Sequence, residues 1–187
     1  SGTMRPTNIN TTGKDTSGAC GGKKCDGEMP GPTLYLGQKD GSFIDNSKLI
    51  IDKRDPSGQS LSRQQLVADF NNDGILDFYL ADHGIGGGNY DGFRDSYFLS
   101  QKNGTWLESS STHLSKKKFK IFDHGGAVGD IDNDGDIDIV LTDLKRVLQC
   151  LYNDGTGKMK IKKCGSINAF GIELGDFDND GDLDIVH

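Results

Sequence analysis

Short stretches of alternating apolar and polar residues run through most of the chain. One of them places Leu76, Phe78 and Leu80 at every second position, and the same alternation returns in residues 137–141 and 183–185. A period of two is typical of a β-strand with one buried face. No stretch of about ten or more residues shows the period of an amphipathic helix. The pattern therefore predicts an all-β fold.

An apolar and aromatic segment followed by a tight turn also occurs three times. These segments begin at Leu34, Tyr97 and Leu151, and their turns contain Asp-Gly or Asn-Gly pairs. Such a pair between alternating apolar residues is the strongest short-range signal of a β-hairpin. Each repeat is therefore expected to hold two strands, a connection and a hairpin, which is the make-up of a four-stranded antiparallel β-propeller blade.

An aspartate-rich loop stands before each of the alternating strands. Loop one covers residues 69–77, loop two covers residues 130–138 and loop three covers residues 176–184. Recurrence of the same loop pattern along a chain is typical of a repeat protein. The repeats predict about three blades, whereas a propeller has typically four to eight. We therefore expect a partial propeller, which is either a piece of a larger one or a chain that closes by self-association.

Each loop carries oxygen-bearing side chains at positions 1, 3, 5 and 9 and a glycine at position 6. Calcium takes six to eight oxygen ligands, and a tightly curled loop brings its alternate positions together. Position 7 can add its backbone carbonyl. We therefore expect about three Ca²⁺ ions, one for each loop. The predicted metal ligands are Asp69, Asn71, Asp73, Ile75, Asp77, Asp130, Asp132, Asp134, Asp136, Asp138, Asp176, Asp178, Asp180, Asp182 and Asp184.

Three alternatives fit parts of the loop pattern. Asp, Asn and Gly are common turn formers, so the loops could be solvated acidic turns, but three copies with one spacing argue against this. An EF-hand requires Glu at position 12 and flanking helices, whereas position 12 is Leu80, Leu141 or His187 here. Magnesium is disfavoured because it prefers octahedral coordination with retained waters.

Residues 128–140, Val-Gly-Asp-Ile-Asp-Asn-Asp-Gly-Asp-Ile-Asp-Ile-Val, resemble the FG-GAP/VCBS repeat of integrin α-subunit propellers and of many secreted bacterial proteins. Phe170-Gly171 is similar to the FG element of that repeat, and residues 125–127 are similar to its GAP element. The resemblance implies a β-propeller with one structural Ca²⁺ per loop, on the face opposite the usual ligand face. Loop one departs from the pattern at Asn71 and Ile75, so we expect weaker binding there.

Composition and charge narrow the choice of partners. The formal net charge is -7, with 28 acidic residues against 21 basic ones. This balance argues against nucleic acid, whose phosphates require a basic face, and no apolar run is long enough for membrane insertion. The first part of the chain lacks an apolar period. We therefore expect a flexible Gly/Thr/Ser-rich tail at residues 1–32 and propeller blades at residues 33–187.

The four cysteines could form two disulfides. Cys150 and Cys164 flank a predicted hairpin, whose opposite strands bring Cβ atoms close enough for a disulfide. Free thiols are the alternative. Cys20 and Cys25 are expected to form a local link in the tail. Two disulfides fit a secreted or cell-surface protein.

Candidate catalytic and recognition residues are few outside the loops. Three histidines could be considered: His83, His113 and His124. His124 precedes Gly125-Gly126 within the repeat, which favours a structural role, so we predict no catalytic residue. The longest connection, residues 82–95, is a candidate recognition loop, and an insertion without function is the alternative. It holds residue types that anchor interfaces: Tyr90, Phe93 and Arg94.

The pattern favours a calcium-stabilised extracellular binding or adhesion module that presents a protein or carbohydrate ligand surface on its propeller loops. No nucleophile elbow or HExxH motif is present, so an enzyme is disfavoured. The resemblance also includes propellers of polysaccharide lyases and hydrolases. Part of a secreted polysaccharide-degrading enzyme is therefore the alternative function. A calcium sensor is disfavoured because rigid hairpin sites do not support a large conformational change.

Overall fold

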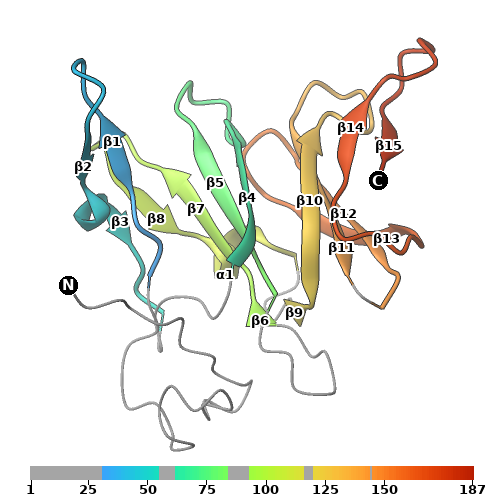
Figure 1. The fold of residues 1–187 in the computed structure, drawn as a ribbon, viewed down its shortest axis with the longest axis horizontal. Helices are drawn as coiled ribbons and strands as arrows, with labels where there is room; N and C mark the ends of the chain where they lie inside the picture. The colour runs from blue at the N-terminus through green and yellow to red at the C-terminus, as the bar shows by residue number, and fades with distance from the viewer. Residues whose placement is uncertain (1–30, 55–61, 84–92, 116–119, 144) are drawn as a thin grey trace, which may run out of the picture.

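The fold of the chain is a row of small antiparallel β-sheets (Figure 1). The computed structural model describes residues 31–54, 62–83, 93–115, 120–143 and 145–187. The predicted tail, the predicted Cys20–Cys25 link and Tyr90 of the predicted recognition loop therefore lie outside the described residues, except for the last two residues of the tail.

The described residues form fifteen short strands and two short helices. In chain order they are β1 (Tyr35–Gly37), β2 (Phe43–Asp45), η1 (Ser47–Leu49), β3 (Ile50–Ile51), β4 (Ser62–Ala68), β5 (Asp77–Asp82), β6 (Phe93–Arg94), β7 (Ser96–Ser100), β8 (Trp106–Glu108), α1 (Ser110–His113), β9 (Lys120–Ile121), β10 (Asp123–Gly129), β11 (Asp138–Asp143), β12 (Leu148–Tyr152), β13 (Lys160–Gly165), β14 (Glu173–Gly175) and β15 (Asp184–Val186).

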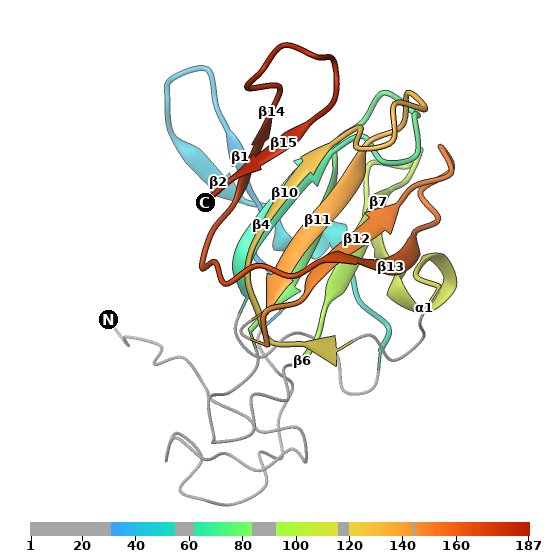
Figure 2. The same ribbon diagram turned by 90° about the vertical axis from the view of Figure 1, so that its right-hand side faces the viewer.

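Two of the sheets are whole blades. In the first blade, β4, β5, β7 and β8 pair antiparallel, and β3 adds a parallel fifth strand beside β8. In the second blade, β10, β11, β12 and β13 pair antiparallel in chain order. The view in Figure 2 looks along the row, with the second blade stacked in front of the first. These sheets confirm the predicted all-β partial propeller.

Each end of the row carries a two-stranded hairpin instead of a whole blade. We call β1–β2 the leading hairpin and β14–β15 the trailing hairpin. They lie at opposite ends of the row in Figure 1. A further two-stranded ribbon, β6–β9, joins the connections that follow β5 and precede β10. Among the described residues no sheet closes into a ring.

The larger apolar core lies between the two blades. Leu66 and Tyr79 of the first blade pack in one cluster with Ile139 and Leu141 of the second. The two sheets approach so closely that a Cβ on Gly126 of the second blade would lie 3.0 Å from a methyl carbon of Leu66 in the first. Every second residue of each strand thus faces the same neighbouring sheet, as the period of two predicts.

The trailing hairpin covers the other face of the second blade. Leu174 and Ile185 pack against a second cluster that contains Val140. A Cβ on Gly129 would lie 2.7 Å from a methyl carbon of Leu183, so a larger residue there would require the Leu183 side chain to move. Each face of the second blade is therefore covered by a neighbouring unit.

One disulfide and the scarcity of helix agree with the sequence analysis. Cys150 and Cys164 are bonded between β12 and β13, with their Cα atoms 5.7 Å apart, which confirms the predicted pair. The described residues contain helices of only four and three residues. None of them is long and apolar enough to cross a membrane.

Candidate metal sites

The three acidic loops lie at the same edge of the row of sheets. Each loop joins the first two strands of its unit, and all three lie at the top of Figure 1. Loop one connects β4 to β5, loop two connects β10 to β11 and loop three connects β14 to β15. Loops that share a sequence pattern therefore occupy equivalent positions in their units.

Two residues in each loop adopt left-handed backbone conformations. The asparagine at position 4 has a φ of 56° in loop one, 58° in loop two and 62° in loop three, and the glycine at position 6 has a φ of 85°, 95° and 95°. Asparagine tolerates this region because its short side chain can hydrogen-bond locally, and glycine has no Cβ to clash. The shared conformations curl every loop in the same way.

The carboxylate at position 1 holds the curled backbone in place. In loop one, the N–H groups of Asp73 and Gly74 donate to Asp69 at 3.1 and 2.7 Å. Loops two and three repeat both bonds at 2.8–3.1 Å. Each loop is therefore preorganised by its own first aspartate.

The carboxylate at position 9 connects each loop to the sheet. Oδ2 of Asp138 accepts the N–H of Ile131 at 3.0 Å, and Oδ1 accepts the N–H of Asn153, directly after β12, at 2.7 Å. Asp77 makes the matching pair of bonds with Phe70 and Ser100, at 2.9 and 2.6 Å. Two carboxylates are thus fully buried at the base of their loops.

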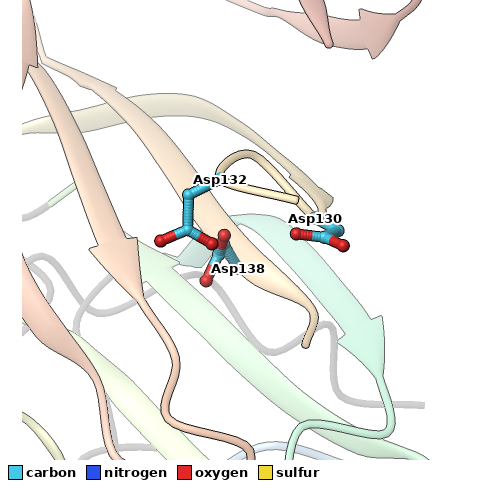
Figure 3. Close-up of side chains that lie close together, drawn as sticks. All are labelled: Asp130, Asp132 and Asp138. Carbon is cyan, nitrogen blue, oxygen red and sulfur yellow. The ribbon is translucent and has the colours of Figure 1, made fainter. Parts of the chain in front are cut away.

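Three carboxylates converge in each of loops two and three. Asp130, Asp132 and Asp138 each offer an oxygen that lies within 4.8 Å of the other two (Figure 3). Asp176, Asp178 and Asp184 form the matching group in loop three. Oxygens this close can all lie 2.3–2.6 Å from one ion, which is the bond length of calcium. The donor set of these two loops therefore fits a hard divalent cation.

Loop one has the same turn with an amide in place of one carboxylate. Asn71 stands at position 3, and its Oδ1 accepts the N–H of Asp73 at 3.1 Å. An amide oxygen is a neutral calcium ligand. Loop one thus has fewer charges with which to hold a cation.

Negative charge accumulates in loop two, and no salt bridge within the described part of the chain offsets it. Burial raises the pKa of Asp138 to about 6, against the lowering effect of its two backbone donors. Loss of hydration, and then the charges of Asp134 and Asp130, raise the pKa of Asp132. A bound cation would relieve this repulsion.

Neighbouring loops are linked to one another by a contact that the sequence analysis missed. The side-chain amide of Asn72 donates to Asp136 at 2.8 Å, and that of Asn133 donates to Asp182 at 2.7 Å. The position-7 side chains therefore bind the preceding loop. Asparagine at position 4 of every loop was the available signal, but it resembled an ordinary turn residue.

The remaining predicted ligands have local roles in the loops. Oδ1 of the position-5 aspartate accepts the N–H of position 7 at 2.9–3.0 Å in all three loops. The residues concerned are Asp73, Asp134 and Asp180, with Ile75, Asp136 and Asp182 as donors. Metal binding by the fifteen predicted ligands stays a prediction at this stage.

Two of the three candidate histidines, His83 and His124, lie away from the loops. The third, His113 of α1, lines a surface hollow together with Asn71 and Asp73 of loop one. His83 follows β5, and His124 stands in β10, both at the strand ends opposite the loops. Their rings lie 4.5 Å apart and pack with Phe122. Burial, followed by the charge of His83, lowers the pKa of His124 to about 4. This packing favours a structural role for both rings.

A buried pair of acids near these rings was not predicted. Asp95 accepts the hydroxyl of Tyr79 at 2.5 Å and the N–H of Asp82 at 2.8 Å. Burial raises the pKa of Asp95 to about 7. Burial and the charge of Asp95 raise the pKa of Asp123 well above its usual range. The pair comes from different blades, so only the folded structure brings it together.

The fold and the loops together define a partial β-propeller with acidic hairpin loops. The family model described as FG-GAP-like repeat matches residues 69–141 and again residues 130–187. These matches cover more than half of the chain, and the chain belongs to the FG-GAP repeat family. No curated protein shows significant sequence similarity to the chain.

Proposed function

We propose that this chain is a calcium-stabilised extracellular binding or adhesion module, with one Ca²⁺ in each acidic loop. The observation that carries the proposal is the convergence of three carboxylates in loops two and three. The shared turn of all three loops supports it, because each loop is already shaped by its own hydrogen bonds. Calcium then acts by fixing hairpins, and the propeller presents the ligand surface.

The expected contribution of calcium is comparable to the stability of a domain. At about 1 mM calcium and a Kd of about 10⁻⁴ M, each site stabilises the folded state by about 1.4 kcal/mol. Three sites would add about 4 kcal/mol, whereas domains are stable by about 5–15 kcal/mol. Loop one contributes least because it has the smallest charge.

Thermal unfolding with and without calcium tests the proposal. In about 1 mM calcium we expect Tm to exceed the value in a chelator by roughly 8–16 °C, since about 4 kcal/mol corresponds to that shift in a chain of this size. Magnesium at the same concentration is the control and should raise Tm less. An identical Tm in calcium and in chelator would contradict the proposal.

Secretion or display at the cell surface is supported by the bond between Cys150 and Cys164, because disulfides persist in oxidising compartments. The proposed ligand is a protein or a carbohydrate. Binding to immobilised glycans and to extracellular matrix proteins, measured in calcium and in chelator, tests this part. Absence of calcium-dependent binding to either class would contradict it.

The buried acids do not support a polysaccharide-degrading activity. Cleavage of a polysaccharide by paired carboxyl groups requires both to reach the glycosidic bond. Asp95 and Asp123, the acid pair away from the loops, are 2% and 0% exposed. We therefore propose binding rather than a polysaccharide-degrading activity.

A further inference from the structure

Asn153, directly after β12, lies at the centre of a buried set of hydrogen bonds. Its side-chain amide donates to the carbonyl of Phe70 at 2.8 Å and to that of Ile137 at 3.0 Å. Its Oδ1 accepts the N–H of Asp154 at 2.9 Å and that of Gly157 at 3.2 Å. The residue is only 6% exposed. The side chain thus uses both its donor and its acceptor capacity inside the protein.

Asn153 joins loop one to loop two. Phe70 is position 2 of loop one and Ile137 is position 8 of loop two, so one amide group binds both loops. The backbone N–H of Asn153 donates to Asp138 of loop two at 2.7 Å. The N–H of Phe70 donates to Asp77 of loop one at 2.9 Å. Because Asp77 and Asp138 are predicted calcium ligands, two neighbouring metal sites share this buried side chain.

A second link runs between the same two loops. The side-chain amide of Asn72 donates to Asp136 at 2.8 Å and to the carbonyl of Gly155 at 3.3 Å. Gly155 lies in the turn of residues 154–157, and Oδ1 of Asn153 binds both ends of that turn. Both links therefore join loop one to the same small part of the second blade.

Ser100 holds the position of Asn153 in the first blade. It donates its N–H to Asp77 at 2.6 Å, as Asn153 does to Asp138. The Ser100 hydroxyl, however, donates to Asp73 of its own loop at 3.0 Å. Serine at this position can therefore anchor one loop, whereas the longer amide of Asn153 also reaches the neighbouring loop.

We propose that Asn153 is a positioning residue through which the calcium sites of loops one and two bind cooperatively. Calcium in loop two would fix Asp138, and Asp138 would in turn fix Asn153. A fixed Asn153 holds the carbonyl of Phe70, next to the predicted ligand Asn71. Loop one then loses less conformational freedom when its own ion binds, which produces positive cooperativity. The inference rests on the calcium sites of the proposed function.

The chain contains a natural probe of loop one. Trp106 is its single tryptophan, and the indole N–H donates to the carbonyl of Leu76, position 8 of loop one, at 2.8 Å. Leu76 follows Ile75, whose carbonyl is a predicted ligand. Trp106 fluorescence should therefore report calcium binding in loop one. The amide NMR signal of Gly74, whose N–H donates to Asp69 at 2.7 Å, is a second readout of the same site.

Calcium titration of the unmodified chain and of Asp132→Ala tests the coupling. Asp132 is an exposed member of the carboxylate group in loop two (Figure 3). It takes no part in the hydrogen bonds of Asn153, so this variant should lose the calcium of loop two and keep the link. We expect the midpoint of the loop one titration to rise at least about fivefold, the lower end of the usual range for coupled sites. An unchanged midpoint would overturn the proposal.

The matched comparison is Asp178→Ala in loop three. This variant removes the equivalent position-3 carboxylate, changes the net charge by the same amount and should also lose one calcium. None of the hydrogen bonds of Asn153 or Asn72 reaches loop three. We therefore expect the loop one midpoint to move less than about twofold. Equal shifts from Asp132→Ala and Asp178→Ala would indicate a long-range effect of charge and would overturn the coupling through Asn153.

The same titrations with Asn153→Ser show whether this side chain carries the coupling. Serine keeps the backbone N–H to Asp138 and removes the amide that reaches loop one. The effect of Asp132→Ala on loop one should then largely disappear, which a merely structural role of Asn153 would not produce. If the full effect remains, the link through Asn72 carries the coupling and the role of Asn153 is overturned.

A second variant decides the question if Asn153→Ser does not fold. Asp136→Ala removes the link through Asn72 and keeps Asn153. Coupling that persists in this variant supports Asn153 as the carrier, and coupling that is lost overturns its role.

Failure of the coupling and failure of the calcium function give different results. Calorimetric titration that shows no calcium binding to the unmodified chain would reject the calcium function and the coupling with it. Calcium binding together with a loop one midpoint that Asp132→Ala leaves unchanged would reject the coupling alone.

Discussion

The aspartate at position 9 holds each acidic loop to the strand that follows it. Asp77, Asp138 and Asp184 all accept an N–H from position 2 of their own loop at 2.9–3.0 Å. They are also predicted metal ligands. The position-7 aspartates differ, because Asp136 and Asp182 accept a side-chain amide from the preceding loop. Substitution at the two positions should therefore have different effects on calcium binding.

We predict that Asp138→Asn removes one calcium site and lowers stability. Asparagine can accept through only one atom, so one of the two backbone donors at this buried position loses its acceptor, at a cost of about 1–3 kcal/mol. Loss of the site costs about 1.4 kcal/mol more in about 1 mM calcium. Calorimetric titration should show one calcium fewer per chain.

The control for this prediction is Asp136→Asn in the same loop. An amide oxygen at position 136 can still accept from Asn72, and the backbone carbonyl of position 7 is unchanged. The number of bound calcium ions should therefore equal that of the unmodified chain. Loss of a calcium from Asp136→Asn, together with retention in Asp138→Asn, would contradict the assignment of ligands.

A second prediction at this scale concerns the pH dependence of stability. The pKa of Asp95 is about 7 in the folded chain, whereas the usual value is 3.8. The folded state therefore binds more protons than the unfolded state between these values, and this group makes stability fall as pH rises from about 4 to about 7. Asp95→Asn should remove this contribution, which is on the order of a few kcal/mol.

Urea unfolding at pH 5 and pH 8, at constant calcium, measures the effect. The unmodified chain should lose more stability between the two pH values than Asp95→Asn does, because only the unmodified chain carries the Asp95 carboxyl, whose ionisation is opposed by burial. The acidic loops titrate in both proteins, so their contribution cancels when the two changes in stability are compared. An equal change in both proteins would show that Asp95 does not govern this pH range.

At the scale of elements, local sequence patterns were sufficient for the strands and the loops. The alternation around Leu76, Phe78 and Leu80 identifies β5, and an Asn-Gly pair identifies the turn between β7 and β8. These features depend on residues that are close in the chain. Strands of two residues, such as β3, β6 and β9, have no period to detect.

Contacts between elements could not be predicted from such patterns. Ser100 and Asn153 anchor the acidic loops from 23 and 15 residues away in the chain. Both are common residue types at strand ends, so nothing local marks them. Asp95 and Asp123 come together only because two blades pack. The loop residues were thus predictable, whereas the residues that support the loops required the fold.

At the scale of the whole molecule, the three acidic loops form one connected row. The side-chain amide of Asn72 joins loop one to Asp136 of loop two, and that of Asn133 joins loop two to Asp182 of loop three. Asp77 and Asp138 are fully buried at the base of loops one and two, whereas Asp184 of loop three is only partly buried. We therefore expect the contact with loop two to matter for calcium binding in loop three.

We predict that Asp182→Ala weakens calcium binding in loop three more than Asp182→Asn does. Both substitutions remove the charge at position 7 and keep the backbone carbonyl, but only the amide oxygen of asparagine can still accept from Asn133. The difference should be about 0.5–1.5 kcal/mol, the net contribution of one hydrogen bond, which is roughly tenfold or less in Kd. Calorimetric titration of the two variants with calcium measures it. Equal affinities in both variants would show that the contact between loops two and three does not support calcium binding.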